Sequence, residues 1–366
     1  MDTVLVTGGA GFIGSCLVRM LISDTACKVV NLDKLTYAGN LESLSDAVND
    51  PRHVFVNGDI GDRDLIAALL AEHRPDAVIH LAAESHVDRS IDEPAPFITT
   101  NVVGTYELLD ATYEYWRTLA DSSRSLFRFV HVSTDEVYGS LGSQGRFDER
   151  SPYAPNSPYS ASKAASDHLA RAYFRTYGLP VVITNSCNNF GPYQFPEKLV
   201  PTVIFNALTG KPVPIYGDGR QVRDWLYVED HCHALLAACR LGAPGEVYLI
   251  GGDAERTNLS IAQELCDLVD ELRLGLHHAP CRSLITHVAD RPGHDRRYAV
   301  NSSKVRRECA WRPSESLSSA LRRTVQWYLD HSSWIERVTS GAYRRDRLGL
   351  SRGTTRHAAE VRSNPQ

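Results

Sequence analysis

A glycine-rich turn between an apolar strand and an amphipathic helix constrains the fold of this chain more than any other feature. Val4–Thr7 is β-branched and apolar, and Phe12–Ile22 carries apolar residues at three- and four-residue spacing. Gly8, Gly11 and Gly14 lie at the junction of the two segments. Glycines at this spacing allow a tight turn and close approach to a pyrophosphate, whose charge the helix N-terminus stabilises. The pattern predicts a phosphate-binding strand–turn–helix unit.

The first half of the chain continues this alternation of strands and helices. Strands are predicted at Val4–Thr7, Lys28–Leu32, His53–Asn57, Ala77–Leu81, Phe129–Ser133 and Val181–Thr184. Helices are predicted at Phe12–Ile22, Arg63–His73, Pro94–Tyr115 and Pro158–Tyr177. Apolar strands joined by helices form a parallel sheet that is covered on both faces. The predicted fold class is α/β, a Rossmann-type doubly wound parallel sheet with a smaller, irregular C-terminal α/β substrate domain.

The pattern becomes irregular after about residue 186, where prolines interrupt short helices and strands. A further predicted helix, Val228–Leu241, returns to the first unit. We expect the Rossmann domain at 1–185 with 226–245 returning to it, and the smaller domain at 186–225 and 246–343. The arginine-rich segment 344–366 is expected to be a disordered tail.

Composition narrows the class of protein. The 366 residues carry 39 Lys and Arg against 44 Asp and Glu, so nucleic acid is not an expected partner. No apolar run approaches the roughly 20 residues of a membrane helix, and no signal segment opens the chain, which favours the cytoplasm without a membrane partner. The eight cysteines form no CxxC pair, and neither His231 with His233 nor His277 with His278 has metal-ligand spacing, so no metal is expected.

Residues at the ends of later strands extend the glycine turn into a dinucleotide site. Asp33 ends the second predicted strand, where a carboxylate binds the ribose hydroxyls of NAD and repels the 2′-phosphate of NADP. The third strand leads to Asp59 and Ile60, beside the adenine, and the fourth leads to small side chains that allow close backbone approach. NAD is therefore the expected cofactor.

Two pairs of residues have the chemistry of proton transfer. Tyr159 and Lys163 lie four residues apart and thus on one face of a predicted helix, where the lysine charge favours a phenolate. Asp135 and Glu136 follow the fifth strand, at the sheet edge where ligands bind, and adjacent carboxylates there suit an acid and a base. With the glycine turn, the Tyr–Lys pair resembles the short-chain dehydrogenase/reductase family.

Longer segments are similar to one branch of that family, the dTDP-glucose 4,6-dehydratases. The similarity runs from residue 3 to about 343. It is carried by Asp33–Leu41, Ala82–Ser90, Thr134–Gly139, Phe195–Leu199, Arg223–His231 and Asp290–Asp295.

The resemblance implies conversion of dTDP-glucose to dTDP-4-dehydro-6-deoxy-glucose and water, by transient C4 oxidation, elimination across C5 and C6, and hydride return to C6. It implies that Tyr159 removes the proton of the 4-hydroxyl, with Thr134 and Ser85 bonded to that oxygen. Glu136 would take the C5 proton, and Asp135 would protonate the departing 6-hydroxyl. Such an acid needs a raised pKa, which burial and the neighbouring glutamate would provide.

The resemblance and the strand positions together give the residue sets of the site. The catalytic set is Thr134, Asp135, Glu136, Tyr159 and Lys163. The cofactor-binding set is Gly8, Gly11, Phe12, Ile13, Gly14, Asp33, Lys34, Leu35, Thr36, Asp59, Ile60, Leu81, Ala82, Ala83, Ser85, Thr100, Tyr159, Lys163 and Asn189. The substrate-binding set is Ser85, Thr134, Asn188, Lys198, Leu199, Pro214, Ile215, Tyr216, Arg223, Asn258, Asp290, Arg291 and His294.

Alternatives remain open at this point. A UDP- or GDP-hexose 4,6-dehydratase differs in the base, and thymine differs from uracil by one methyl group, worth about 1–3 kcal/mol. The Asp135–Glu136 pair argues against an epimerase, and its presence together with Tyr159 and Lys163 argues against a non-catalytic NAD-binding regulator. The resemblance also implies a homodimer formed through Pro94–Tyr115 and Pro158–Tyr177. The product could serve dTDP-rhamnose biosynthesis or another deoxysugar.

Overall fold

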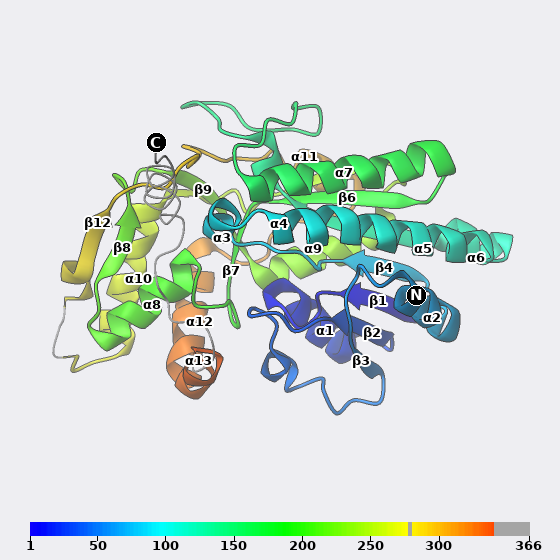
Figure 1. The fold of residues 1–366 in the computed structure, drawn as a ribbon. Coiled ribbons are helices and arrows are strands. Elements are labelled where there is room, and N and C mark those ends of the chain that lie inside the picture. Colours follow the sequence, from blue (N-terminus) through cyan, green and yellow to red (C-terminus); the bar gives the residue numbers. More distant parts are fainter. Residues whose placement is uncertain (277–279, 340–366) are drawn as a thin grey trace, which may run out of the picture.

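The computed structural model describes residues 1–276 and 280–339 and contains a large parallel sheet (Figure 1). Its seven strands lie in the order β10-β6-β5-β4-β1-β2-β3, and every neighbouring pair is parallel. Their bounds are β1 Thr3–Thr7, β2 Lys28–Asp33, β3 His53–Asn57, β4 Ala77–His80, β5 Arg128–Thr134, β6 Val181–Ser186 and β10 Val247–Ile250. This order confirms the predicted Rossmann-type sheet.

Helices cover both faces of this sheet. On one face α1 (Phe12–Asp24) packs against α9 (Val228–Leu241), and the other face carries α2 (Arg63–His73), α5 (Thr105–Arg117) and α7 (Pro158–Tyr177). The predicted helices Arg63–His73, Pro158–Tyr177 and Val228–Leu241 are confirmed to the residue.

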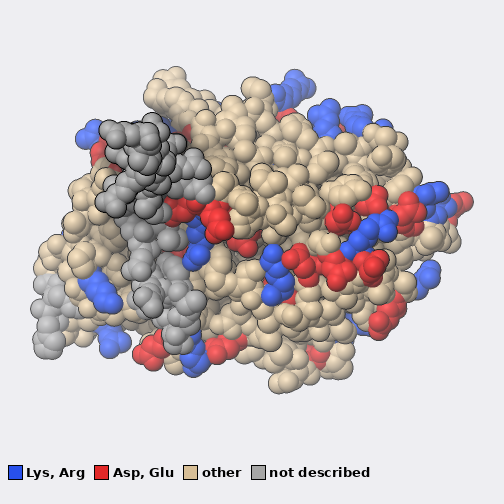
Figure 2. Space-filling view, in the orientation of Figure 1, with Lys and Arg blue, Asp and Glu red and all other residues tan. Residues whose placement is uncertain are grey.

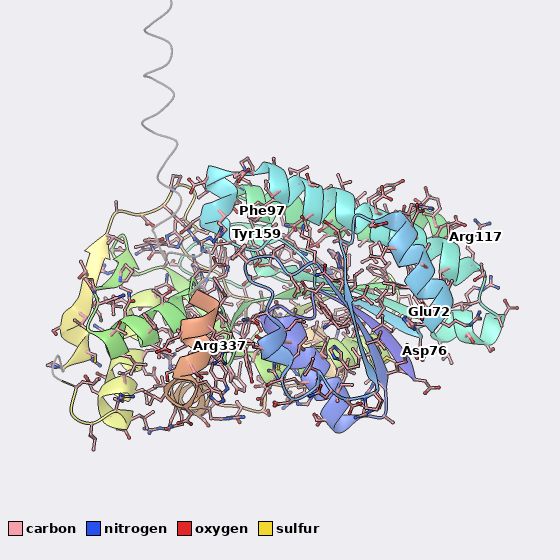
Figure 3. The ribbon with its side chains drawn as sticks, turned by 60° about the horizontal axis from the view of Figure 1, so that its bottom comes forward. Glu72, Asp76, Phe97, Arg117, Tyr159 and Arg337 are labelled. Carbon is pink, nitrogen blue, oxygen red and sulfur yellow. The ribbon has the colours of Figure 1, made fainter. Side chains whose placement is uncertain are left out.

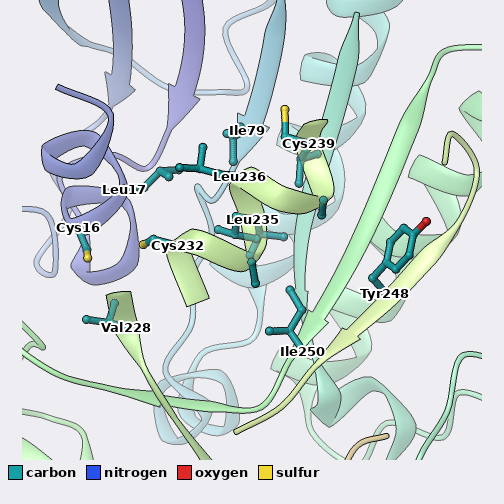
Figure 4. Close-up of a cluster of buried hydrophobic side chains, with 14 of the residues drawn as sticks. Cys16, Leu17, Ile79, Val228, Cys232, Leu235, Leu236, Cys239, Tyr248 and Ile250 are labelled. Carbon is teal, nitrogen blue, oxygen red and sulfur yellow. The ribbon is translucent and has the colours of Figure 1, made fainter. Parts of the chain in front are cut away.

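Alternation along the strands builds two cores from one sheet. Val4 and Val6 point to the α1–α9 side, and Leu5 points to the α2–α5–α7 side. Figure 4 shows Leu17 of α1 and Leu236 of α9 meeting over the sheet in the first core. Burying a leucine of this kind contributes about 1.5–3 kcal/mol, so α9 is fixed to the sheet although it follows the smaller unit in sequence.

The smaller unit has its own sheets and core. A three-stranded sheet has the order β11-β9-β7 (Glu255–Thr257, Val222–Tyr227, Asn188–Phe190), and β12 (Ile285–Val288) pairs with β8 (Val213–Tyr216). Four helices pack around them: α8 Leu199–Thr209, α10 Asn258–Leu272, α12 Leu317–Asp330 and α13 Ser332–Thr339. Leu321, Val325 and Tyr328 of α12 are buried there, as their helical spacing predicts.

The chain crosses between the two units more than once. After α9, β10 pairs with β6 at the edge of the large sheet, with Val247 beside Ile183. A division at residue 245, expected from the sequence, leaves β10 with the smaller unit, whereas its pairing joins it to the large sheet. His277, His278 and the expected tail 344–366 lie outside the described residues.

The predicted helix Pro94–Tyr115 is interrupted. The structure has α4 (Ala95–Phe97), a π-helical turn η2 (Ile98–Gly104) and then α5. Within the wide turn, the Asn101 side chain accepts a hydrogen bond from the Glu84 N–H and donates one to the Glu84 carbonyl oxygen. Thr100, in the same turn, lines the pocket described below. Apolar periodicity alone does not distinguish such a turn from a regular helix.

Short elements complete the description. They are η1 Leu41–Leu44, α3 Val87–Asp92, α6 Asp121–Leu126, η3 Asp135–Tyr138, η4 Cys281–Leu284 and α11 Ser303–Glu308. On the face drawn in Figure 2, acidic and basic side chains are interspersed. Surface ion pairs of the protein include Arg63–Asp110 at 2.7 Å. Among the described helices, none has the length and apolar character required to cross a bilayer.

Candidate active site

A pocket opens at the carboxyl ends of the central strands and reaches the segment 194–198 of the smaller unit. It is lined by almost all of the expected cofactor-binding residues: Gly8, Gly11, Phe12, Ile13, Gly14, Asp33, Lys34, Thr36, Asp59, Ile60, Leu81, Ala82, Ala83, Ser85, Thr100, Tyr159, Lys163 and Asn189. Leu35, the remaining expected residue, is outside the lining and takes a left-handed φ of 53°.

The glycine turn has the close packing that a phosphate cradle requires. Gly8 has a φ of +74°, and a Cβ there would lie 2.6 Å from the amide nitrogen of Ala82. A Cβ on Gly14 would lie 2.1 Å from the carbonyl oxygen of Gly8. Only glycine fits at these two positions, and the start of α1 therefore lies directly against the pocket.

Asp33 is held at the end of β2 by backbone donors. Its Oδ2 accepts from the Ala10 N–H at 2.9 Å, and its Oδ1 accepts from the Leu35 N–H at 2.8 Å. Burial raises the pKa of Asp33, and the two backbone donors oppose that shift. A fixed carboxylate beside a glycine cradle fits the ribose hydroxyls of a dinucleotide, so the lining matches the requirements of NAD.

The two adjacent carboxylates lie in a short helix directly after β5. Asp135 is 1% exposed; burial raises its pKa well above the usual value, and so does the charge of Glu136. Burial also raises the pKa of Glu136, but the cations Arg291 and Lys198 favour its charged form. The surroundings of Asp135 therefore favour its protonated form, whereas Glu136 lies near positive charge.

Tyr159 lies beside these carboxylates on α7. The helix starts here because Ser157 and Ser160 form a capping box with Pro158 in the first turn. The Tyr159 ring packs edge-on against Phe97, with centroids 6.3 Å apart (Figure 3). Burial and the charge of Glu136 raise its pKa, and a hydrogen bond with Thr134 opposes that shift.

Lys163 lies one turn further along α7. Its Nζ donates to the carbonyl oxygen of Val132 at 2.9 Å, and burial lowers its pKa to about 8. The carboxylate of Asp167 opposes this lowering. The sequence predicts that the Lys163 charge favours a phenolate at Tyr159. In the structure the largest influences on the Tyr159 pKa are burial and the charge of Glu136, and both raise it.

The expected substrate-binding residues divide into two groups. Ser85, Thr134, Asn188 and Lys198 line the pocket. The rest lie beyond its lining: Leu199, Pro214, Ile215, Tyr216, Arg223, Asn258, Asp290, Arg291 and His294. Of these, the Ile215 side chain belongs to the core of the smaller unit, and Leu199 packs against that core.

Several of these outer residues are connected by charged hydrogen bonds. The guanidinium of Arg291 donates to Asp88 at 2.8 Å, and the Tyr216 hydroxyl donates to the other oxygen of Asp88 at 2.8 Å. Arg223 is 4% exposed, and it donates to the carbonyl oxygen of Asp295 at 2.9 Å. These contacts bring cations from the smaller unit toward the carboxylate pair, and the charges of both arginines oppose the rise in the Glu136 pKa.

The pocket also contains residues that sequence reasoning did not assign. They are Leu32, Ala38, Gly39, Gly58, Glu84, Val132, Ser133, Ser186, Cys187, Gln194, Phe195 and Glu197. Most of them adjoin an assigned residue, and Ala38, Gly39, Glu84, Phe195 and Glu197 lie within the segments that carry the resemblance. Proximity to those segments was the available signal.

Comparison with known proteins identifies close relatives along nearly the whole chain. Residues 5–324 match the family model described as GDP-mannose 4,6 dehydratase. The chain is 56% identical over 351 residues to a dTDP-glucose 4,6-dehydratase of Xanthomonas campestris pv. campestris (strain B100), covering 96% of this chain and 100% of the relative. It is 55% identical over 349 residues to dTDP-glucose 4,6-dehydratase 1 of Escherichia coli (strain K12), covering 93% and 96%.

Solved structures have the same fold. A dTDP-glucose 4,6-dehydratase of Streptomyces venezuelae with NAD and TYD bound matches with a TM-score of 0.83 and 47% identity, over 92% of this chain and 99% of that one. A UDP-glucose 4-epimerase of Thermotoga maritima matches with a TM-score of 0.77 and 29% identity, over 90% and 99%. The sheet order, the pocket and these similarities lead to one assignment: the chain belongs to the GDP-mannose 4,6 dehydratase family and, within it, to the dTDP-glucose 4,6-dehydratases.

Proposed function

We propose that the chain converts dTDP-glucose to dTDP-4-dehydro-6-deoxy-glucose and water as an NAD-dependent hydro-lyase. The observation that carries this conclusion is the pair of buried Asp135 and partly buried Glu136 beside Tyr159, in a chain 56% identical to a dTDP-glucose 4,6-dehydratase. An enzyme that only oxidised and reduced the sugar would not require two further carboxyl groups in its site.

The residues of the site divide the proton transfers among themselves. When bound, NAD would supply reversible hydride transfer: the two electrons taken at C4 return at C6, so C4 remains a ketone and the net change is loss of water. Tyr159 takes the proton of the 4-hydroxyl, and Thr134 and Ser85 hydrogen-bond that oxygen. The C4 ketone acidifies the C5 hydrogen, which Glu136 removes. Asp135 gives its proton to the departing 6-hydroxyl, and C5 is reprotonated when the hydride returns to C6.

The electrostatic surroundings support these two opposite roles. Asp135 is buried beside a second carboxylate, which favours the protonated form that an acid needs. Glu136 faces Arg291 and Lys198, which favour the ionised form that a base needs. Each role contributes about 10²–10⁴-fold to the rate.

The substrate's diphosphate requires cations, and we assign them to Lys198, Arg223 and Arg291. Burial lowers the pKa of His294 to about 4, so we assign its ring to the same site as a neutral hydrogen-bonding group. Lys198 lines the pocket, and the two arginines are near enough to Glu136 to influence its pKa. The remaining members of the substrate-binding set complete the nucleotide-sugar site in this proposal. NAD binds to the large sheet (1–185 with 226–250), and the nucleotide sugar binds mainly to 186–225 and 251–343.

Two properties of the whole protein belong to the same proposal. We assign it to the cytoplasm, where reducing conditions suit eight cysteines that are all buried and unpaired. We also assign a homodimer formed through α5 and α7, because large apolar side chains are exposed on this side of the molecule: Ile98, Val103, Tyr106 and Tyr177.

The test is to incubate the purified protein with NAD and dTDP-glucose labelled with deuterium at C4. We expect loss of one water by mass spectrometry, with the deuterium on the C6 methyl group. UDP-glucose and GDP-mannose serve as competing substrates. If the protein preferred either one, that nucleotide sugar would replace dTDP-glucose as the proposed substrate. Binding of NAD without any dehydrated product would refute the proposed function.

A further inference from the structure

Three segments that border the cofactor pocket are joined by one buried carboxylate. Glu197 is 3% exposed at its side chain, and its Oε1 accepts from the Tyr37 hydroxyl at 3.0 Å. Its Oε2 accepts from Nε of Arg89 at 3.4 Å. Tyr37 follows β2, Arg89 lies in α3, and Glu197 precedes α8, so the contacts join both units of the protein.

Ring contacts reinforce the same junction. The Arg89 guanidinium lies over the Tyr37 ring, 3.8 Å from its centroid, and Phe195 packs edge-on against that ring at 5.7 Å. We refer to Tyr37, Arg89, Phe195 and Glu197 as the clasp. His86 also lies 3.8 Å from Glu197, but burial lowers the His86 pKa to about 2, so its ring is neutral.

The clasp lies at the border of the pocket that fits NAD. Thr36, Ala38 and Gly39, on either side of Tyr37, line this pocket, and so do Phe195 and Glu197 themselves. A second connection lies next to the clasp, where Nζ of Lys198 donates to the carbonyl oxygen of Ser85 at 2.9 Å. The segment after β2 and the segment before α8 are therefore bonded to each other across one pocket.

We propose that the clasp retains NAD in the protein throughout the catalytic cycle, with Tyr37 and Glu197 as positioning residues. This inference rests on the proposed function, in which electrons taken from C4 return to C6 of the same sugar. If the reduced cofactor left during the cycle, those electrons would be lost, and the sugar intermediate could not be reduced at C6. A closed clasp makes NAD a resident group rather than an exchanging substrate.

The test compares NAD dissociation from the parent protein with that from Tyr37→Phe, which keeps the ring contacts and removes only the hydroxyl. Loss of a hydrogen bond to a buried charged acceptor is expected to raise the dissociation rate about tenfold. The protein is loaded with radiolabelled NAD, chased with unlabelled NAD, and filtered at intervals. The matched control is Tyr115→Phe, which loses a 3.0 Å bond to the Pro75 carbonyl outside the pocket and should match the parent.

Glu197→Gln provides a second, independent variant, since it weakens the contacts with both Tyr37 and Arg89. For Glu197→Gln we expect faster NAD dissociation than from the parent, and reduced cofactor in the filtrate during turnover. For Tyr37→Phe we expect kcat at saturating NAD to stay within about twofold of the parental value. Thermal unfolding checks that each variant folds, and either variant alone suffices for the comparison.

The proposal is overturned if the folded variants release NAD at the parental rate. The chase needs no turnover, so it gives an answer even for a protein that dehydrates no sugar. A parent that fails to release water from dTDP-glucose would refute the proposed function, whereas unchanged dissociation rates would refute the clasp.

Discussion

Asp135 and Glu136 are neighbours in the chain but have different surroundings. The Asp135 carboxyl is buried with Glu136 beside it, and one of its oxygens has no hydrogen-bond partner among the described residues. Glu136 faces the cations Arg291, Lys198 and Arg223. Burial raises the pKa of both carboxyl groups, but three cations oppose that rise at Glu136, whereas at Asp135 the charge of Glu136 adds to it.

Replacing the proposed acid should separate the two halves of the reaction. In Asp135→Asn, the sugar still reduces NAD, but elimination slows by about 10²–10⁴-fold because the 6-hydroxyl departs without a proton donor. Single-turnover absorbance should then show reduced nicotinamide accumulating. The matched control, Asp64→Asn, changes an exposed carboxylate in the first turn of α2 and should behave as the parent. An unchanged elimination rate in Asp135→Asn would show that Asp135 is not the acid that protonates the 6-hydroxyl.

His231 gives a prediction for stability against pH. It is fully buried in α9, neither ring nitrogen has a partner among the described residues, and burial lowers its pKa to about 3. Below about pH 6.5 the unfolded chain binds a proton that the folded chain excludes, so stability is complete above that pH and falls as pH drops toward 3. We expect His231→Leu to lose less unfolding free energy than the parent between pH 7 and 4.5, by about 2–3 kcal/mol.

The measurement is urea unfolding at both pH values. His233→Leu is the matched control, since His233 is exposed on the same helix. A pH dependence in His231→Leu as steep as in the parent would mean that other groups cause it.

Sequence reasoning could identify residues whose chemistry is local. Tyr159 with Lys163, and Asp135 with Glu136, are recognisable because a helix turn or a strand end fixes their relative positions. Glu197 was not assigned, because its importance comes from Tyr37, which lies 160 positions earlier in the chain. No periodicity in the sequence records a contact of that kind.

At the scale of secondary-structure elements, the packing of the turn between β1 and α1 requires glycine, which has no side chain, at Gly8 and Gly14. Gly14→Ala would place a methyl group 2.1 Å from the Gly8 carbonyl oxygen, a backbone atom that cannot rotate away. We expect a loss of about 1–3 kcal/mol in unfolding free energy, together with weaker NAD binding, because the turn must open.

Chemical denaturation and NAD titration test this expectation. Gly142→Ala is the matched control, since a Cβ at Gly142 meets nothing within 4 Å. Equal stability of the two variants would show that the turn tolerates the added methyl group.

Element boundaries show where sequence patterns suffice and where they do not. The helix Pro158–Tyr177 has a capping box at its start and Gly178 at its end, with a φ of 78°, so local signals define it completely. The π-helical turn Ile98–Gly104 has no such signal. It depends on Asn101, which also donates to Ser162 of α7 at 2.9 Å, and this contact exists only in the folded protein.

At the scale of the whole molecule, the proposed homodimer should depend on the apolar side chains of η2 and α5. Ile98 and Val103 are each 48% exposed. We expect Ile98→Asp with Val103→Asp to convert a dimer into a monomer, because two charges would have to be buried at the interface. Sedimentation velocity measures the change.

Leu274→Asp is the control for this experiment, since Leu274 is 86% exposed and lies two residues after α10, in the smaller unit. It should leave the mass in solution unchanged. A parent protein that is already a monomer would contradict the homodimer.

The path of the chain has a consequence for synthesis on the ribosome. Six of the seven large-sheet strands precede residue 187, but α9 and β10 follow the first excursion into the smaller unit. Until α9 emerges, Val130 and Val182 have no cover on their side of the sheet. The nascent polypeptide therefore exposes apolar surface during translation. A message interrupted before codon 228 would yield an aggregation-prone fragment rather than a functional domain.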